Sequence, residues 1–194
     1  MKKKLLAIFL LVSSLIFSEE RILLFEEIFL DEKTEMVYAI GEETPYTGVV
    51  EDYKFLIKDR VLEGRVIFKN GLMEGTFKLL YPSGKTASIA TYKNGETDGI
   101  QKEYYENGQI KMEVLHKNGK AEGYLRTYYL NGKLEGEEKY QNGLREGLTK
   151  SYYENGVLKE ERFYKNDKLQ GISKSYYPNG KLQIEASFKE DKLD

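Results

Sequence analysis

Four glutamates recur every 24 residues in the second half of the chain, and paired carboxylates are the groups that glycosidases use. They are Glu113, Glu137, Glu161 and Glu185. A catalytic pair needs two different environments that drive the two pKa values apart. Here the four glutamates have closely similar sequence surroundings, and each is predicted below to face a basic residue. We therefore interpret them as structural, and we expect no catalytic residue among them.

A single histidine, His116, lies at a position that the other repeats fill with an aromatic ring. The corresponding residues are Tyr92, Tyr140, Tyr164 and Phe188. With one histidine and no cysteine, the chain cannot supply a Ser-His-Asp triad, a histidine-rich metal site or a thiolate site. Gly84-Lys85-Thr86 resembles the end of a phosphate-binding loop, but the glycine required five residues earlier is Leu79. The sequence thus predicts a protein that is not an enzyme and that holds no metal or cofactor.

The glutamates belong to a unit of 24 residues that is repeated five times between residues 75 and 194 without an insertion. Its opening glycines are Gly75, Gly99, Gly123, Gly147 and Gly171. Six residues after each glycine comes a tyrosine, namely Tyr81, Tyr105, Tyr129, Tyr153 and Tyr177. A period of this length is typical of a stacked array, in which each unit buries its surfaces against its neighbours.

Each unit contains two runs of strand length and two turns. The first turn carries Asn-Gly in most units, as at Asn107-Gly108, and the second carries it at Asn94-Gly95, Asn118-Gly119 and Asn142-Gly143. Asn-Gly between β-rich runs favours a two-residue hairpin with a type I′ turn, and we predict that turn at Asn107-Gly108. In the last two units the second turn changes to Asn166-Asp167 and Glu190-Asp191.

A two-residue hairpin centred on Asn107-Gly108 places Lys102 opposite Glu113 and Tyr105 opposite Ile110. The same rule predicts the pairs Arg126–Glu137, Lys150–Glu161 and Lys174–Glu185, together with Tyr129–Leu134, Tyr153–Leu158 and Tyr177–Leu182. Opposite charges and aromatic–aliphatic pairs both stabilise neighbouring strands. In the first regular unit, Lys78 instead faces Ile89.

Neither face of these hairpins is purely apolar, since one carries Ile100, Lys102 and Tyr104 and the other Gln101, Glu103 and Tyr105. We therefore predict an all-β fold, an elongated single-layer array of antiparallel hairpins, rather than a sandwich with a thick core. Residues 48–194 form the array, with a degenerate unit at 48–74 and regular units at 75–98, 99–122, 123–146, 147–170 and 171–194. Residues 19–47 are predicted to be an N-terminal cap with a strand at 35–40; the start of a short helix in 22–30 is the alternative.

The chain begins with three lysines and an apolar run that ends at Ser18, the pattern of a secretory signal peptide over residues 1–18. We expect the protein to be exported to the periplasm, the outer surface or the medium; an uncleaved membrane anchor is the open alternative. Residues 19–47 carry nine acidic and two basic residues, whereas the array at residues 48–194 is close to neutral. Nucleic acid needs a basic excess, so we expect no nucleic-acid partner.

The unit G-x-x-x-x-Y-Y-x-N-G-x-L-x-x-E-x-x-Y-x-N-G resembles the variant MORN repeat of bacterial proteins. The likeness is plainest at Tyr104-Tyr105-Glu106-Asn107-Gly108 and Tyr152-Tyr153-Glu154-Asn155-Gly156, and it covers residues 48–194. It implies an elongated run of antiparallel hairpins that serves in protein assembly and, in some members, in lipid contact. Bacterial members of the variant type are often labelled as antitoxins, so the resemblance also implies an antitoxin-like role.

Rigid rings beside cations suit a protein-binding surface. Two rows of such residues form our candidate interaction surface: Tyr104, Tyr128, Tyr152 and Tyr176, with Lys102, Arg126, Lys150 and Lys174. We expect an exported, non-enzymatic repeat protein that binds a protein partner at the cell envelope. An immunity or antitoxin role is the alternative. Lipid binding is weaker, because anionic headgroups repel an acidic chain.

Charged residues crowd the last strand, among them Lys189, Glu190 and Asp191. Charge blunts a strand edge against pairing with another chain. We therefore expect a monomer or a weak self-associator; the alternative is an end-to-end dimer through this strand.

Overall fold

The computed structural model describes residues 21–57 and 60–194, so the predicted signal peptide at 1–18 lies outside the described residues. As predicted, the regular structure is almost entirely β. The elements are β1 (Ile22–Leu24), a 3-10 helix η1 (Phe25–Glu27), β2 (Ile28–Asp31), β3 (Met36–Ala39), β4 (Gly48–Ile57), β5 (Arg60–Lys69), β6 (Leu72–Met73), β7 (Gly75–Leu80), β8 (Thr86–Lys93), β9 (Glu96–Thr97), β10 (Gly99–Tyr104), β11 (Ile110–Lys117), β12 (Lys120–Tyr128), β13 (Leu134–Gln141), β14 (Leu144–Arg145), β15 (Gly147–Tyr152), β16 (Leu158–Lys165), β17 (Lys168–Tyr176), β18 (Leu182–Lys189) and β19 (Lys192–Leu193).

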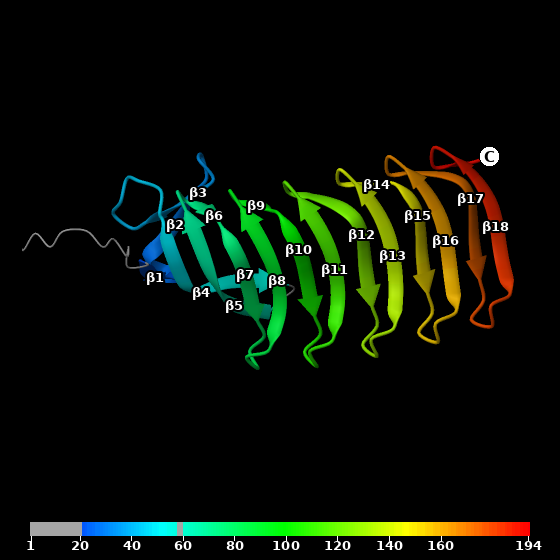
Figure 1. Ribbon diagram of the computed structural model, residues 1–194, viewed down its shortest axis with the longest axis horizontal. Helices are drawn as coiled ribbons and strands as arrows, with labels where there is room; N and C mark the ends of the chain where they lie inside the picture. The colour runs from blue at the N-terminus through cyan, green and yellow to red at the C-terminus, as the bar shows by residue number, and fades with distance from the viewer. Residues whose placement is uncertain (1–20, 58–59) are drawn as a thin grey trace, which may run out of the picture.

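Each long strand from β4 to β18 pairs antiparallel with the next long strand along the chain, which gives one elongated sheet (Figure 1). The short strands β6, β9, β14 and β19 each follow a turn and pair with the end of the strand before it. β1 joins β4 in parallel at the N-terminal end. The predicted all-β array of hairpins is confirmed.

The predicted type I′ turn occurs in each unit, but at the second turn and not at the first. Asn118 and Gly119 have φ values of 48° and 73°, so both central residues are left-handed, as a type I′ turn requires. In the first turn Gly108 has φ 90° and its N–H donates to the carbonyl of Tyr105 at 2.8 Å, whereas Asn107 is not among the residues with positive φ. That pattern is a three-residue loop, a type I turn followed by a left-handed glycine. The prediction for Asn107-Gly108 is therefore wrong.

The predicted charge register is confirmed, and the predicted tyrosine register is wrong by one residue. Lys102 lies opposite Glu113, and the equivalent pairs in the next three units are also found. Beyond that point a bulge at Lys111 shifts the pairing, so that Tyr104 and not Tyr105 lies opposite Ile110. The same shift pairs Tyr128–Leu134, Tyr152–Leu158 and Tyr176–Leu182. Bulges place an extra residue on one strand and increase the local twist.

A hydrogen bond from a tyrosine side chain joins each regular unit to the next. The Tyr105 hydroxyl donates to the carbonyl of Tyr128 at 2.7 Å, and the same bond recurs between the other consecutive units. These bridging tyrosines and their acceptors are Tyr81 to Tyr104, Tyr105 to Tyr128, Tyr129 to Tyr152 and Tyr153 to Tyr176, at 2.6–2.8 Å. The tyrosine displaced by the bulge thus connects neighbouring units at the loop end of the hairpins.

The other end of the hairpins is joined through the type I′ turns. The N–H of Gly119 donates to the carbonyl of Thr97 at 2.8 Å, and that of Gly143 donates to Ala121 at 2.9 Å. In the later units Asp167 and Asp191 stand in the glycine position with φ 65° and 67°. Their carboxylates accept hydrogen bonds from the N–H groups of Arg145 and Leu169, both at 2.8 Å. The change from glycine to aspartate therefore adds a contact to the preceding unit.

The hydrophobic core lies at the N-terminal end of the sheet, on one face of β4, β5, β7 and β8. Buried residues there include Val50, Val66, Phe68, Phe77 and Leu79. Val37 and Ala39 of β3 pack against this cluster from outside the sheet. Among the described residues from β10 onward, the buried hydrophobic ones are Val114 and Tyr164. The later units therefore form a single layer that is open to solvent on both faces.

The N-terminal segment has a two-stranded sheet, β2 with β3, beside the main one. The strand predicted at 35–40 is observed as β3, and 22–30 folds as two strands around the single turn η1. The segment is tied to the array by the N–H of Val37, which donates to the carbonyl of Gly71 at 2.9 Å. Its role as a cap remains a prediction. Within residues 21–57 and 60–194, no helix has the length and apolar character that a membrane crossing requires.

Candidate interaction surface

All eight residues of the predicted interaction surface lie on one face of the sheet. Lys102, Arg126, Lys150 and Lys174 occupy β10, β12, β15 and β17, and a tyrosine ends each of these strands two residues later. Because side chains two apart on a strand share a face, each tyrosine projects on the same side as its cation. We call this side the charged face, and we call the other side the opposite face.

A row of alternating charges runs across the middle of the charged face, perpendicular to the strands. Arg126, Lys150 and Lys174 each lie between two glutamates of neighbouring strands, because the register pairs them on both sides. Lys102, at the end of the row, lies between Glu113 and Ile89. In order the row is Lys102, Glu113, Arg126, Glu137, Lys150, Glu161, Lys174 and Glu185. Arg126 Nε lies 2.7 Å from Glu137 Oε2, and Lys174 Nζ lies 3.3 Å from Glu185 Oε2. The row is therefore electrically balanced within the sheet.

Tyrosines at the strand ends donate hydrogen bonds to glutamates of the charge row. The Tyr128 hydroxyl donates to Glu113 Oε1 at 2.8 Å, and the Tyr176 hydroxyl donates to Glu161 Oε1 at 3.3 Å. Burial, followed by the bond to the Glu113 carboxylate, raises the pKa of Tyr128. The rings are half-buried and alternate along the array with the aliphatic residues Ile110, Leu134, Leu158 and Leu182. This gives an aromatic–aliphatic band on one side of the charge row.

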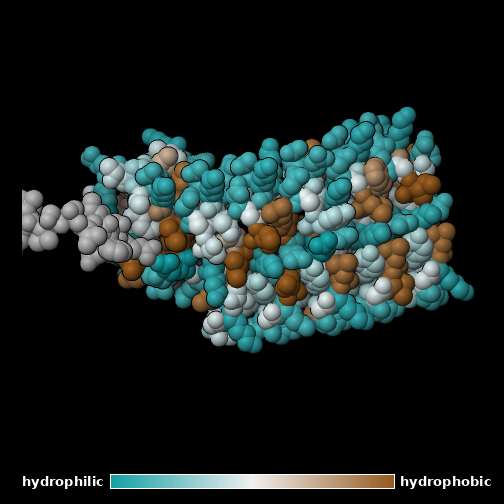
Figure 2. Space-filling model, in the orientation of Figure 1, coloured by the Kyte–Doolittle hydropathy of each residue, from teal (hydrophilic) through white to brown (hydrophobic). Residues whose placement is uncertain are grey.

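A second apolar band lies on the other side of the charge row, and it is more exposed. Ile100, Tyr124, Leu148 and Ile172 are 55%, 44%, 41% and 55% exposed, and each lies two residues before a cation of the row. Leu115 and Phe163 lie opposite Ile100 and Leu148 and extend this band, whereas Lys139 and Ser187 lie opposite Tyr124 and Ile172. Figure 2 shows hydrophobic side chains gathered on both sides of a hydrophilic strip along the array. Leu115 and Phe163 were missed from the sequence, although their register follows from the predicted charge pairs.

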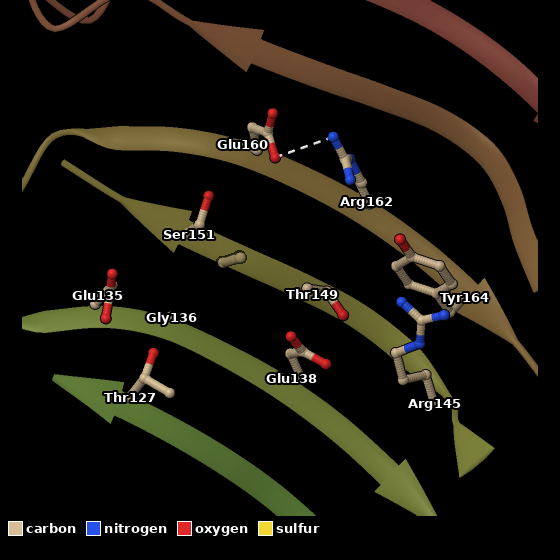
Figure 3. Close-up of a pocket in the computed structure, with 11 residues that line it drawn as sticks. Thr127, Glu135, Gly136, Glu138, Arg145, Thr149, Ser151, Glu160, Arg162 and Tyr164 are labelled. Carbon is tan, nitrogen blue, oxygen red and sulfur yellow. Dashed lines mark ion pairs between the residues drawn. The ribbon is translucent and has the colours of Figure 1, made fainter. Parts of the chain in front are cut away.

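The opposite face carries a hollow that the sequence did not suggest (Figure 3). It has a volume of about 380 Å³ and is lined by small residues such as Gly136, Thr149 and Ser151. Two arginines around it have partners: Arg162 lies 3.1 Å from Glu160, and Arg145 lies 4.0 Å from the centre of the Tyr164 ring. The space therefore arises where small side chains of neighbouring strands meet.

The site gives no arrangement that points to acid–base or metal chemistry. Within the part of the chain that the structure describes, no three His, Asp or Glu side chains are grouped so as to hold a metal ion. The structure places His116 in β11 opposite Gly99, on the face away from the charge row. Its Nδ1 is buried without a hydrogen-bond partner among the described residues, and burial lowers the pKa of His116.

The lowered pKa predicts acid sensitivity at this single histidine. His116 binds a proton less readily in the folded state than in the unfolded chain, where it takes up a proton below a pH of about 6.5. Stability is therefore expected to fall as the pH drops from about 7 toward about 5. His116→Tyr, which places the ring found in neighbouring units, is expected to flatten this slope in urea titrations at several pH values. An unchanged slope in the variant would show that other groups cause it.

Five segments of the chain match a family model described as the MORN repeat variant, and together they cover more than half of the chain. They are residues 73–94, 97–118, 121–142, 145–166 and 169–190. The chain belongs to this family. Each matched MORN segment begins two residues before the glycine that opens a unit of the array and ends in the type I′ turn. The candidate residues on β10, β12, β15 and β17 all lie inside matched segments.

No curated protein is significantly similar in sequence to this chain. The MORN repeats suggest a repeat protein that contacts other proteins or membrane surfaces, and the family is typically non-enzymatic.

Proposed function

We propose that this MORN-repeat chain is an exported, non-enzymatic protein whose charged face binds a protein partner at the cell envelope. The observation that carries the proposal is the exposed apolar band beside the charge row, which repeats in register through four units. Exposed apolar residues that form a continuous patch are a feature of interaction sites, whereas isolated ones are not. The basic, apolar residues 1–18 support the export step.

Three features of the face favour a protein over a lipid surface. The charge row is neutral overall, so it offers no excess of cations for anionic headgroups. The apolar residues form narrow bands with charges between them, which suits a partner with a matching pattern. Tyrosine and arginine, both present here, are enriched where proteins bind one another. A toxin is one class of such a partner, which keeps the antitoxin-like role as an alternative.

The proposal predicts that two substitutions in the exposed band abolish partner capture. Leu148→Glu with Ile172→Glu places two carboxylates in the band without touching the core, since both side chains are exposed. Burying unpaired charges in an interface costs several kcal/mol, so retention of the partner from an envelope extract is expected to fall at least about tenfold. Quantitative mass spectrometry of tagged protein pulled from envelope and cytosolic extracts measures this.

A matched control removes two exposed leucines that lie off the charged face. Leu130 is in a first turn, and Leu193 of β19 pairs with Phe188 on the opposite face. Leu130→Glu with Leu193→Glu is expected to leave capture unchanged. Equal loss in both double variants, or a partner that comes only from the cytosolic extract, would contradict the proposal.

A further inference from the structure

The order of the charges makes the charge row complementary to its own reversal. It contains equal numbers of cations and carboxylates in strict alternation, beginning with Lys102 on β10 and ending with Glu185 on β18. When such a row is reversed, every positive position falls on a negative one. Two sheets that meet face to face can be related by a two-fold axis that runs parallel to the strands at the position between β13 and β15. This axis reverses the row, because it brings β10 of one copy over β18 of the other.

We infer that the charged face binds the charged face of a second copy of this chain, in a two-fold dimer with this axis. In that dimer Lys102 faces Glu185 of the other copy, and Glu113 faces Lys174. The two central pairs are Arg126 with Glu161 and Glu137 with Lys150. The inference goes beyond the proposed function, because it adds a second copy of the chain as an occupant of the same surface.

The same operation also brings apolar residues of the two bands together. In the aromatic–aliphatic band each tyrosine meets an aliphatic residue: Tyr104 meets Leu182, Tyr176 meets Ile110, Tyr128 meets Leu158 and Tyr152 meets Leu134. In the exposed band Leu115 meets Ile172 and Tyr124 meets Phe163, whereas Ile100 meets Ser187 and Leu148 meets Lys139. A two-fold interface must be self-complementary, because each residue pair occurs twice. The charge row and the aromatic–aliphatic band satisfy that condition in every pair, and the exposed band satisfies it in two of its four pairs.

The area available is that of an ordinary protein interface. Strands spaced about 4.8 Å apart from β10 to β18, each contributing roughly six residues, cover about 750 Å² per copy. Stable interfaces bury about 800 Å² per partner. Most of these charges already have a partner within the sheet, such as Lys102 with Glu113, Arg126 with Glu137 and Lys174 with Glu185, so pairing across the dimer gives specificity more than affinity. The dimer is therefore a weak one that depends on protein concentration, with the apolar bands supplying the attraction.

Cross-linking tests the arrangement cleanly, because the chain contains no cysteine. Leu115→Cys and Ile172→Cys leave the charge row intact and lie on β11 and β17, about 24 Å apart within one copy. In the dimer they face each other across the two copies. A mixture of the two single variants is expected to give a covalent dimer with a short bis-maleimide, and each variant alone is expected to give none. Absence of the product in the mixture, or equal product from one variant alone, would overturn the inference.

A charge-swap cycle tests the pairing independently. Lys102→Glu and Glu185→Lys each place like charges across the dimer twice, and each is expected to raise the dissociation constant at least about tenfold. The double variant restores opposite charges across the dimer and is expected to return to the wild-type value. The in-sheet pairs Lys102–Glu113 and Lys174–Glu185 are disrupted by the same substitutions, so they cannot produce this rescue. A double variant no tighter than either single variant in sedimentation equilibrium overturns the inference.

Different results would overturn the dimer and the proposed envelope partner. A wild-type chain that stays monomeric, while the Leu148→Glu, Ile172→Glu variant loses an envelope partner, overturns the dimer and leaves the proposed function standing. A chain that dimerises through this face and captures no other protein supports the dimer and overturns the proposed envelope partner.

Discussion

Replacing the four bridging tyrosines by phenylalanine is expected to lower the free energy of unfolding by about 4 kcal/mol, at about 1 kcal/mol for each lost hydrogen bond. The hydroxyls of Tyr81, Tyr105, Tyr129 and Tyr153 donate to carbonyls of the following unit at 2.6–2.8 Å. The rings remain, so packing is preserved and the loss reports on the contacts between units. Because domains are stable by only about 5–15 kcal/mol, this is a large fraction of the total.

Urea unfolding followed by circular dichroism measures the effect. In an array whose units are stable only through their neighbours, the variant is also expected to unfold over a broader range of urea concentration. Tyr177→Phe is the matched control, since among residues 21–57 and 60–194 the Tyr177 hydroxyl has no hydrogen-bond acceptor, and it is expected to change stability by less than about 0.5 kcal/mol. A four-fold variant as stable as the control would show that the bridges do not hold the units together.

Gly64→Ala is expected to cost about 2–3 kcal/mol, because there is no room for a side chain at this position. A Cβ on Gly64 would overlap the carbonyl oxygen of Lys78 on the neighbouring strand β7. The backbone there is not left-handed, so the cost comes from the close approach of two strands beside the core and not from φ. Thermal unfolding of the variant measures the loss.

Gly136→Ala provides the comparison, since Gly136 also lies within a strand without a positive φ. Its Cβ would meet the Thr127 side-chain oxygen at 3.1 Å, a contact that a rotation of the threonine relieves. We expect a cost below about 1 kcal/mol there. Equal costs at the two positions would contradict the view that β5 and β7 are held closer than the later strands.

The regular hairpins could be predicted from the sequence because charge and turn chemistry repeat in register. The pair of Lys102 with Glu113 predicts the strand register of one hairpin, and the same 24-residue spacing predicts it for the other three units. The bulge at Lys111 could not be predicted, since nothing at that position distinguishes a bulged residue from a paired one. For the same reason the type I′ turn was expected at Asn107-Gly108, where a three-residue loop forms instead.

The candidate site was predicted in part. The cations and the first tyrosine of each unit share a face because strand alternation requires it, and this could be inferred without a structure. The bridging role of the second tyrosine depends on the position of a carbonyl in the next unit, which the spacing alone does not give. The hollow beside Gly136 depends on how small residues of three strands meet, so it too required the structure.

The charged face is the proposed binding surface of this protein. Hydroxyl-radical footprinting of the purified complex with the captured partner tests it most directly, because it reports on individual side chains. We predict protection of Tyr124, Leu148 and Phe163, with Leu130 and Ile184, which are exposed off this face, unchanged. Protection of Ile184 and of residues around the opposite hollow, with the charged face still reactive, would contradict the claim.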